Sequence, residues 1–212
     1  MARRARRSAP SGATEAREKA TQSLLDAAEG LLKEVGYAGI TTRALAEKAG
    51  VNHGLVHYYF GSMEEVFVQV LERFTEKLVE RQREMYAADV PFIDKWRTAW
   101  DFQETDLDDG YNKIWLELQA MSWNHPEMKE RIAQVDSEWR AVLIDAFSAA
   151  LEDYGVTDQF PPAAMVAMVM TISQGFTLER LSNIQEGHRE MLDWIDAWLV
   201  SLEEAKAARE RG

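Results

Sequence analysis

The sequence predicts an all-α protein built from about nine helices. Three observations lead to this prediction. Apolar residues recur every three or four positions along most of the 212-residue chain, which is the period of an amphipathic helix. Glycine, proline and asparagine clusters interrupt these stretches, as expected where helices end. No stretch alternates apolar and polar residues as a half-buried strand does, and no internal repeat is visible.

The chain divides into three predicted parts: an arm over 1–13, a three-helix domain with a helix-turn-helix over 14–61, and a larger helical domain over 62–212. The arm is rich in Arg, Ser, Pro and Gly, and we expect it to be disordered. Ser62 and Glu65 have the spacing of a capping box at the start of a long helix. Outside the helix-turn-helix, helices are expected over 15–35, 63–85, 92–106, 111–123, 126–153, 162–186 and 188–208.

The composition is that of a soluble globular protein, with 46% hydrophobic residues available for a core. The longest apolar run, 163–172, is about half the length of a membrane-spanning helix. The basic N-terminal stretch is not followed by the apolar region of a signal peptide. The absence of cysteine excludes disulfides and thiolate redox switches. We therefore expect a cytoplasmic protein that does not enter a membrane.

The formal net charge of −12 is unevenly distributed along the chain. Residues 1–60 contain nine basic and six acidic residues, whereas the rest of the chain contains 15 basic and 30 acidic residues. A basic N-terminal module can approach phosphate while an acidic body is repelled from it. The charge pattern is thus compatible with a nucleic-acid partner in spite of the acidic total.

The segment 41–60 has the residue types of a helix, a tight turn and a short second helix. Gly50 stands where the chain must leave the first helix in a left-handed conformation. Asn52 is expected to cap the second helix, and Val51 and Val56 to fill the space between the two. This pattern predicts a helix-turn-helix.

The outward face of the second helix carries hydrogen-bonding aromatic and imidazole side chains and no acid. A solvated helix face is normally charged, and this one is better suited to a phosphate backbone and base edges. The alternative is an ordinary helical hairpin with a structural role. The residues of this face are His53, Gly54, Leu55, His57 and Tyr58.

The run from Ile40 to Phe67, with TTRALAEKAGV, a short helix ending in YYF, and then GSMEEVF, resembles the DNA-binding signature of the TetR family of bacterial transcriptional regulators. The signature covers about an eighth of the chain, and the rest resembles the family only in length and helical pattern. The resemblance implies a sequence-specific, dimeric transcriptional regulator. We expect a repressor that a small molecule releases from a palindromic operator in double-stranded DNA.

Thr42 is placed to cap the first helix of the motif and to offer a hydroxyl to phosphate. The resemblance implies phosphate contact for this residue and groove contact for Arg43. The residues expected to contact DNA within the motif are Thr42, Arg43, Asn52, His53, Gly54, Leu55, His57 and Tyr58.

Three positions depart from the family pattern. Leu55 stands where a small or hydroxylated residue is usual, His57 where tyrosine is usual, and Met63 where a lysine commonly meets phosphate. Leu55 can pack on a thymine methyl group, and His57 can reach a base or a phosphate. The operator is therefore expected to differ from that of a typical relative.

The four arginines of the N-terminal arm have two interpretations. They form either a solubilising basic tail or an arm that follows the DNA backbone or enters the minor groove. These residues are Arg3, Arg4, Arg6 and Arg7.

All seven tryptophans lie in the second region of the chain. Each can simply fill the core of a helical domain. As a set on three consecutive helices, however, bulky aromatic and thioether side chains suit the wall of an adaptable apolar cavity. We expect a lipophilic or aromatic ligand rather than a phosphorylated one. The candidate ligand-binding residues are Trp96, Trp100, Trp115, Met121, Trp123, Trp139 and Phe147.

The last two predicted helices have the apolar character of an interface. Residues 163–172 are apolar nearly all round, as expected of a helix that packs inward and against a partner. The resemblance implies that these helices pair with their copies in a homodimer, which makes the operator roughly palindromic. The candidate dimerisation residues are Met165, Val169, Ile172, Phe176, Met191, Ile195, Trp198, Leu199 and Leu202.

Neither a cofactor nor a metal is expected. His53 and His57 have the i, i+4 spacing of a helical metal pair, but the H-E-x-x-H pattern and a third ligand are missing. The acidic run 106–110 does not align with a calcium-binding loop. Because the chain carries no recognisable catalytic motif, we do not expect an enzyme. The alternative function is a small-molecule carrier or enzyme that uses the aromatic cavity.

Overall fold

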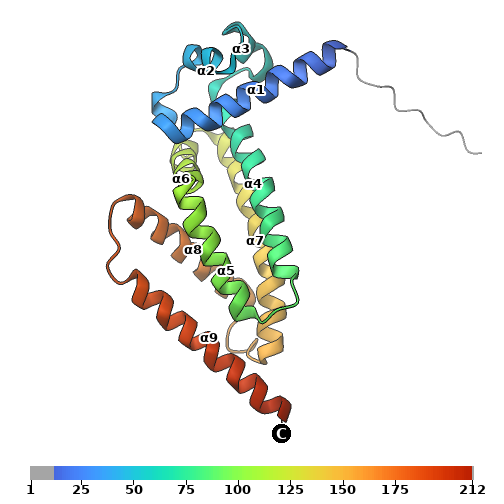
Figure 1. The fold of residues 1–212 in the computed structure, drawn as a ribbon, viewed down its shortest axis with the longest axis vertical. Coiled ribbons are helices and arrows are strands. Elements are labelled where there is room, and N and C mark those ends of the chain that lie inside the picture. Colours follow the sequence, from blue (N-terminus) through green and yellow to red (C-terminus); the bar gives the residue numbers. More distant parts are fainter. Residues whose placement is uncertain (1–11, 212) are drawn as a thin grey trace, which may run out of the picture. The chain divides into compact units, whose positions relative to one another are not determined.

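The computed structural model describes residues 12–211, and this range contains helices and no strand (Figure 1). The all-α prediction is confirmed. The helices are α1 (Gly12–Val35), α2 (Thr42–Ala49), α3 (Gly54–Phe60), α4 (Met63–Ala87), α5 (Phe92–Asp108), α6 (Tyr111–Ser122), α7 (Pro126–Tyr154), α8 (Pro162–Leu181) and α9 (His188–Arg211), with a short 3-10 helix η1 (Tyr37–Gly39) after α1.

The chain folds into two compact units that meet between Val70 and Leu71, within α4. The predicted functional boundary between residues 61 and 62 stays a prediction. Among the helices of residues 12–211, none combines the length and the apolar character that crossing a bilayer requires.

The first unit is held together by apolar side chains that alternate at helical spacing along α1 and meet those of α2, α3 and the start of α4. Burying a leucine or valine side chain contributes roughly 1.5–3 kcal/mol, so this small core is the main source of stability for the motif. Its fully inaccessible members are Leu24, Ala28, Leu32, Leu45, Val56, Val66 and Val70.

The N-terminal cap of α2 is Thr41 and not the expected Thr42. Thr41 has the extended backbone of a cap residue (φ −108°, ψ 154°), and its hydroxyl oxygen accepts a hydrogen bond from the Ala44 amide at 3.1 Å. Thr42 is the first residue inside the helix. The difference arises because only the residue before the first helical turn can turn its oxygen onto the free amides.

The turn between α2 and α3 has the predicted left-handed glycine, but the residue directly before α3 is His53 and not the expected cap Asn52. Gly50 takes a left-handed conformation (φ 68°, ψ 30°), and its amide bonds back to the end of α2. Asn52 lies two residues before Gly54, the first residue of α3, and its side-chain oxygen accepts a hydrogen bond from the Gly54 amide at 2.9 Å. The chain then leaves α3 at Gly61 (φ 77°), and the Ser62 hydroxyl accepts from the Glu65 amide at 3.1 Å at the start of α4.

The second unit is a helical bundle in which α7 contacts α6, α8 and α9, and α9 also packs on α5 (Figure 1). Its core forms where the apolar stripes of α5, α7, α8 and α9 converge. The buried members of this core are Ile93, Trp96, Leu143, Phe147, Leu151, Met165, Val166, Ile195 and Leu199.

Charged and polar pairs fix the helices of this bundle around its core. Each pair joins two different helices, so it sets their relative register. The pairs are Glu72 with Arg131, Arg81 with Asp106, Arg97 with Asp196, Glu104 with Arg180, Tyr154 with Glu203 and Glu179 with His188.

Helix α8 ends at Leu181, five residues before the predicted end. Asn183 takes a left-handed conformation (φ 60°), and the Ile184 amide bonds back to the Glu179 carbonyl at 2.8 Å. Asparagine tolerates this conformation better than other residues with a side chain. The local hydrogen bonds of this cap therefore stop the helix without a glycine or a proline.

Candidate nucleic-acid interface and ligand cavity

Helix α3 presents the predicted contact face to solvent. His53, Gly54, His57 and Tyr58 are exposed, with Tyr58 at 74%, while Val56 and Phe60 on the opposite side are buried. One face of the helix packs into the core, and the opposite face is exposed to solvent and carries no acidic residue. Such a face can approach the edge of a base pair without charge repulsion from the phosphates.

The other predicted contacts of the motif lie beside this face. Arg43 on α2 and Asn52 in the turn are exposed, whereas Thr42 and Leu55 are half-buried. Since the Asn52 oxygen is occupied by the Gly54 amide, its amide nitrogen is the group left to donate to a partner. These DNA-contact assignments stay predictions.

The His57 side chain is oriented by its own helix end. Its Nδ1 lies 3.2 Å from the carbonyl oxygen of Gly61, so the ring donates through Nδ1 and keeps Nε2 as an acceptor in the neutral imidazole. The hydrogen bond thus assigns the tautomer. An exposed Nε2 acceptor is complementary to the base amino groups of the major groove.

A further basic group adjoins α3 and was not predicted from the sequence. The guanidinium of Arg17 on α1 lies 5.8 Å from the centre of the Tyr59 ring and is exposed. The sequence alone does not reveal this contact, because 42 positions separate the two residues along the chain.

Met63, the third departure from the family pattern, is half-buried at the start of α4. The predicted contacts Arg3, Arg4, Arg6 and Arg7 lie outside the described residues.

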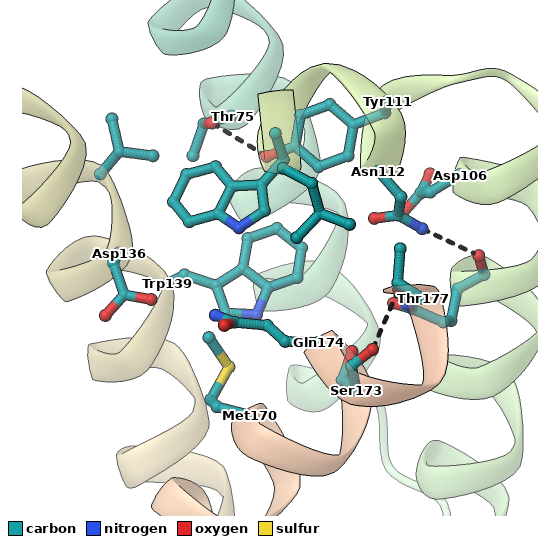
Figure 2. Close-up of a pocket in the computed structure, with 14 residues that line it drawn as sticks. Thr75, Asp106, Tyr111, Asn112, Asp136, Trp139, Met170, Ser173, Gln174 and Thr177 are labelled. Carbon is teal, nitrogen blue, oxygen red and sulfur yellow. Dashed lines mark hydrogen bonds between the residues drawn. The ribbon is translucent and has the colours of Figure 1, made fainter. Parts of the chain in front are cut away.

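The second unit contains a cavity of about 70 Å³ between α4, α5, α6, α7 and α8 (Figure 2). Apolar and polar groups share its wall, with Trp139, Met170 and Val135 among the former. Its full lining is Thr75, Gln103, Asp106, Tyr111, Asn112, Trp115, Leu116, Val135, Asp136, Trp139, Met170, Ser173, Gln174 and Thr177. We call it the first cavity.

A second cavity of about 60 Å³ adjoins the first. The two share Gln103, Trp139, Met170 and Ser173, so they form neighbouring chambers on either side of these side chains. The second cavity is more aromatic, and its remaining lining residues are Gln82, Tyr86, Trp96, Ala99, Trp100, Leu143 and Val169. An elongated molecule can extend from one chamber into the other if the shared side chains rotate.

A chain of hydrogen bonds orients the polar wall of the first cavity. The side-chain amide of Gln103 donates to the Thr177 hydroxyl at 2.8 Å, and the side chain of Asn112 donates to the backbone carbonyl of Gln103 at 3.4 Å (Figure 2). The hydroxyl groups of Thr75 and Tyr111 lie 3.2 Å apart. Burial raises the pKa of Tyr111 to about 12. The phenol is therefore neutral at physiological pH and can donate or accept.

Asp106 is buried beside this polar wall. Its carboxylate accepts a hydrogen bond from Arg81 at 2.6 Å. Desolvation by burial raises the pKa of Asp106, and the hydrogen bond and charge of Arg81 oppose the rise. A buried carboxylate with only one cationic partner is stabilised by any further donor that reaches it.

The predicted ligand-binding residues do not share one environment in the structure. Trp115 and Trp139 line the first cavity, and Trp96, Trp100 and Trp139 line the second. The other three, Met121, Trp123 and Phe147, line neither. Their role in ligand binding stays a prediction without support from the cavity geometry.

Two of those three residues have clear alternative environments. Phe147 is buried in the core, where its ring packs edge-on against Phe92. Trp123 lies at the C-terminal end of α6 with 72% of its surface exposed, because the helix ends there and nothing covers it. Helical spacing predicts that these side chains share faces of their helices, but it does not reveal which face turns toward the cavity.

Several cavity residues were not identified from the sequence. Thr75 and Gln82 of α4, Gln103 of α5 and Thr177 of α8 are polar side chains on otherwise apolar helix faces. A polar residue within an apolar stripe is the signal that marks such positions. Thr75, Gln82 and Thr177 are indeed buried.

The predicted dimerisation residues are mostly part of the core of their own chain. Met165, Ile195 and Leu199 belong to the buried cluster, and Val169, Met191, Trp198 and Leu202 pack against it. Phe176 is buried against Trp100 and stacks on His188 at 4.0 Å between ring centres. Ile172 is half-buried. Four of the nine predicted residues are thus buried in their own chain, and the other five are half-buried. Their role in dimerisation stays a prediction.

The outer faces of α8 and α9 also carry large apolar side chains. Met168 and Leu178 on α8 and Trp194 on α9 are exposed, with Trp194 at 72%. Leu181 at the end of α8 is exposed as well. Exposed large apolar side chains are candidates for contact with another protein surface.

Within residues 12–211, no group of three or more His, Asp or Glu side chains is arranged to hold a metal ion. His57 lies on the exposed face of α3, and His53 is the exposed residue directly before this helix.

Comparison with known proteins places the motif in a family. Residues 24–70 match the model of the bacterial regulatory proteins of the tetR family. The HTH-type transcriptional regulator CymR of Pseudomonas putida is 30% identical over 135 residues, which are 63% of this chain and 66% of CymR. The chain thus covers less than two thirds of the curated relatives it matches first.

Solved structures extend the similarity to the fold of nearly the whole chain. A TetR-family transcriptional regulator from Mesorhizobium loti superposes with a TM-score of 0.68 and 15% identity, over 88% of this chain and 96% of that one. The regulator FadR of Bacillus subtilis, solved with stearoyl-CoA, gives a TM-score of 0.58 and 14% identity, over 87% of this chain and 96% of FadR.

The helix-turn-helix with its exposed, acid-free face, the all-helical second unit and the match of residues 24–70 agree with one another. The segment 24–70 is the DNA-binding segment of the tetR family of bacterial regulatory proteins, and nearly the whole chain is similar in fold to solved structures of that family.

Proposed function

We propose that this protein is a sequence-specific transcriptional repressor that binds its operator as a homodimer and is released by a small molecule held in the second unit. The acid-free, exposed face of α3 carries the DNA-binding part of the proposal. Its residues are anchored by Val56 and Phe60 and oriented by hydrogen bonds of the helix ends. A preorganised polar face in a basic module is suited to the major groove.

The two cavities support a small-molecule effector. Thr75 and Gln82, which line them, belong to α4, and this helix begins at Met63 directly after the motif. A ligand that contacts α4 can favour one position of this helix over another. Operator affinity then falls by the difference between the ligand's affinities for the two states.

The outer faces of α8 and α9 support a homodimer. Met168, Leu178 and Trp194 are too large and too exposed for a solvated surface and would be covered by a second copy of the chain. We propose these side chains for the contact in place of the inward-facing set. Trp194→Glu is expected to convert a dimer to a monomer in a light-scattering measurement of mass, and an unchanged mass would contradict the assignment.

The protein acts in the cytoplasm in this proposal, where its operator lies, and it catalyses no reaction. The alternative function is a carrier or enzyme that uses the aromatic cavities alone. Such a protein needs no exposed acid-free helix in a basic module, and the match of residues 24–70 to a family of regulators favours DNA binding.

Selection of bound sequences from a pool of random double-stranded DNA tests the proposal directly. A two-fold symmetric enriched site is expected, because each protomer of a dimer reads one half-site. Binding to that site should also weaken steeply with salt as phosphate contacts are lost. Recovery of no enriched sequence, together with no binding to any DNA at low salt, would reject the regulator and leave the carrier.

A further inference from the structure

We propose that the effector is an organic amine that binds as a cation, with an aromatic or aliphatic body among the tryptophans and its ammonium group beside Asp136. The proposal rests on the proposed function for its regulatory meaning and on the cavity alone for its chemistry. Five observations support it: the charges of the lining, the position of Asp136, the aromatic side chains, an unpartnered buried amide, and the absence of a cationic group among the described lining residues.

The charges that line the cavities have one sign. Asp106 and Asp136 line the first cavity, and no described residue lining either cavity is lysine, arginine or histidine. The arginines that pair with the two acids, Arg81 and Arg140, are not part of the lining. A ligand inside therefore meets carboxylate oxygens and no cation.

Asp136 is the carboxylate that a ligand can reach. It is half-buried on α7, and one of its oxygens, Oδ2, accepts from Arg140 Nε at 2.6 Å. The other oxygen is available to a second donor. Asp106, by contrast, is a more deeply buried residue of the lining and is held by Arg81. Asp136 is thus the acceptor, while Asp106 adds negative potential to the same cavity.

Aromatic faces surround the same space. Trp139 lies three residues after Asp136 on α7, and Figure 2 shows both side chains on one side of the first cavity. Trp115 lines the cavity from α6. An ammonium group near a tryptophan face is attracted by the ring quadrupole, and the attraction is strongest where water is excluded. A carboxylate beside two indoles is the combination that binds organic cations.

Gln82 gives an independent sign of a ligand in the second cavity. Its side chain is 6% exposed, and its amide oxygen is buried without a hydrogen-bond partner among the described residues. Leaving a buried amide unpaired is costly in free energy. A hydrogen-bond donor on the ligand body, within the chamber lined by Trp96 and Trp100, would satisfy this oxygen.

The lining disfavours an anionic ligand. A carboxylate or phosphate placed in the first cavity would face the carboxylates of Asp106 and Asp136, and no cation among the described residues of the lining could pair with it, because Arg81 and Arg140 are paired with the two acids outside the lining. FadR of Bacillus subtilis was solved with stearoyl-CoA. A fatty acyl thioester with its phosphates does not fit the charge pattern of these two cavities.

Three probes of matched length test the inference: 4-phenylbutan-1-amine, 4-phenylbutan-1-ol and 4-phenylbutanoate. The amine is protonated at neutral pH, as a lysine side chain is. Binding is followed on the full chain without DNA by the change in tryptophan emission, since four tryptophans line the cavities. We expect the amine to bind about ten-fold more tightly than the alcohol and the carboxylate to bind weakest.

Two variants locate the cation. Asp136→Asn keeps the shape of the side chain and removes its charge, so it should weaken amine binding about ten-fold and change alcohol binding by less than about two-fold. Asp145→Asn is the matched control, because Asp145 is exposed on the same helix and lines neither cavity. It should leave the affinity for all three probes unchanged.

A third variant tests the second cavity. Gln82→Leu removes the amide at similar volume and should leave the amine preferred over the alcohol. It should also tighten the binding of butylbenzene, which has no polar group, because the unpaired amide is gone. Weaker binding of butylbenzene to this variant would contradict the role of Gln82.

Equal binding of the three probes, preference for the carboxylate, absence of amine binding, or equal loss in the two aspartate variants would each overturn the inference. These outcomes are independent of the proposed function, since a protein that binds no DNA can still prefer the amine, and a DNA-binding protein can reject it.

Discussion

Replacing His57 with alanine tests whether the recognition face reads bases or only follows the backbone. In the structure the ring donates through Nδ1 to the Gly61 carbonyl at 3.2 Å, which leaves Nε2 as an exposed acceptor. In the major groove only the amino groups of adenine and cytosine donate from base edges. We therefore expect His57 to accept from the amino group of adenine or cytosine at one base pair of each half-site, and to discriminate between base pairs by the place of that group in the groove.

The substitution is expected to change two free energies, that of operator binding and that of unfolding. Loss of a base contact should weaken binding to the selected operator by about 1–3 kcal/mol per half-site. Loss of the exposed intramolecular bond to Gly61 should lower the free energy of unfolding by only about 0.5 kcal/mol. The unfolding change is smaller because water replaces the lost partner at an exposed site. Affinity and stability thus separate in this variant.

The assay is a titration of His57→Ala on the selected operator, on a random duplex, and on operators with each base at the predicted position. His125→Ala is the matched control, because His125 is exposed in the second unit and precedes α7. Its operator affinity should match that of the unmodified protein. Thermal unfolding of both variants checks that the first unit stays folded.

Two results would refute the reasoning. An equal loss of affinity on operator and random duplex would show that His57 contacts phosphate, since only base contacts depend on sequence. Unchanged binding of the unmodified protein after removal of the amino group at the contacted base pair, with purine in place of adenine or 2-pyrimidinone in place of cytosine, would show that the ring does not accept from that group.

Three further predictions concern stability. Thr41→Ala removes the side-chain cap of α2 and should lower the free energy of unfolding by about 1 kcal/mol in urea denaturation, whereas an unchanged value would show that the cap bond is dispensable. Phe147→Ala should cost about 3–5 kcal/mol because it opens a space in the core, and Trp123→Ala less than about 0.5 kcal/mol because that side chain is exposed; similar costs would contradict these environments. Burial raises the pKa of Tyr111 to about 12, so between its ordinary value near 10 and that value the unfolded chain loses a proton that the folded chain keeps. Stability should accordingly fall with rising pH in this window, and less steeply in Tyr111→Phe; equal slopes for both proteins would exclude Tyr111 as the cause.

The helices and the helix-turn-helix could be predicted from the sequence because their signals are local. Gly50 in a left-handed turn, Asn52 at the helix start and Ser62 with Glu65 each act through backbone bonds within a few residues. Local signals failed where two neighbouring residues have similar chemistry, as with Thr41 and Thr42. They failed again at Asn183, where a left-handed asparagine ended a helix that the apolar pattern extended.

The two cavities could be predicted only as a tendency. Seven tryptophans in one region indicate an aromatic domain, yet Trp139 lines both cavities while Trp123 is in solvent. Helical periodicity defines the faces of a single helix. It does not specify the neighbour toward which each face turns, since that depends on the crossing of helices far apart in sequence.

The sequence by itself determined the helical class of the protein, the anchored and exposed sides of α3, and the charge difference between the N-terminal residues and the rest. Only the tertiary structure decided which side of α8 and α9 serves the chain's own core. It also brought Gln82 of α4, Asp106 of α5 and Asp136 of α7 to adjoining cavities. The reason is that α8 is apolar on several sides, and such a helix gains nearly equal free energy by burying any of them until its neighbours are in place.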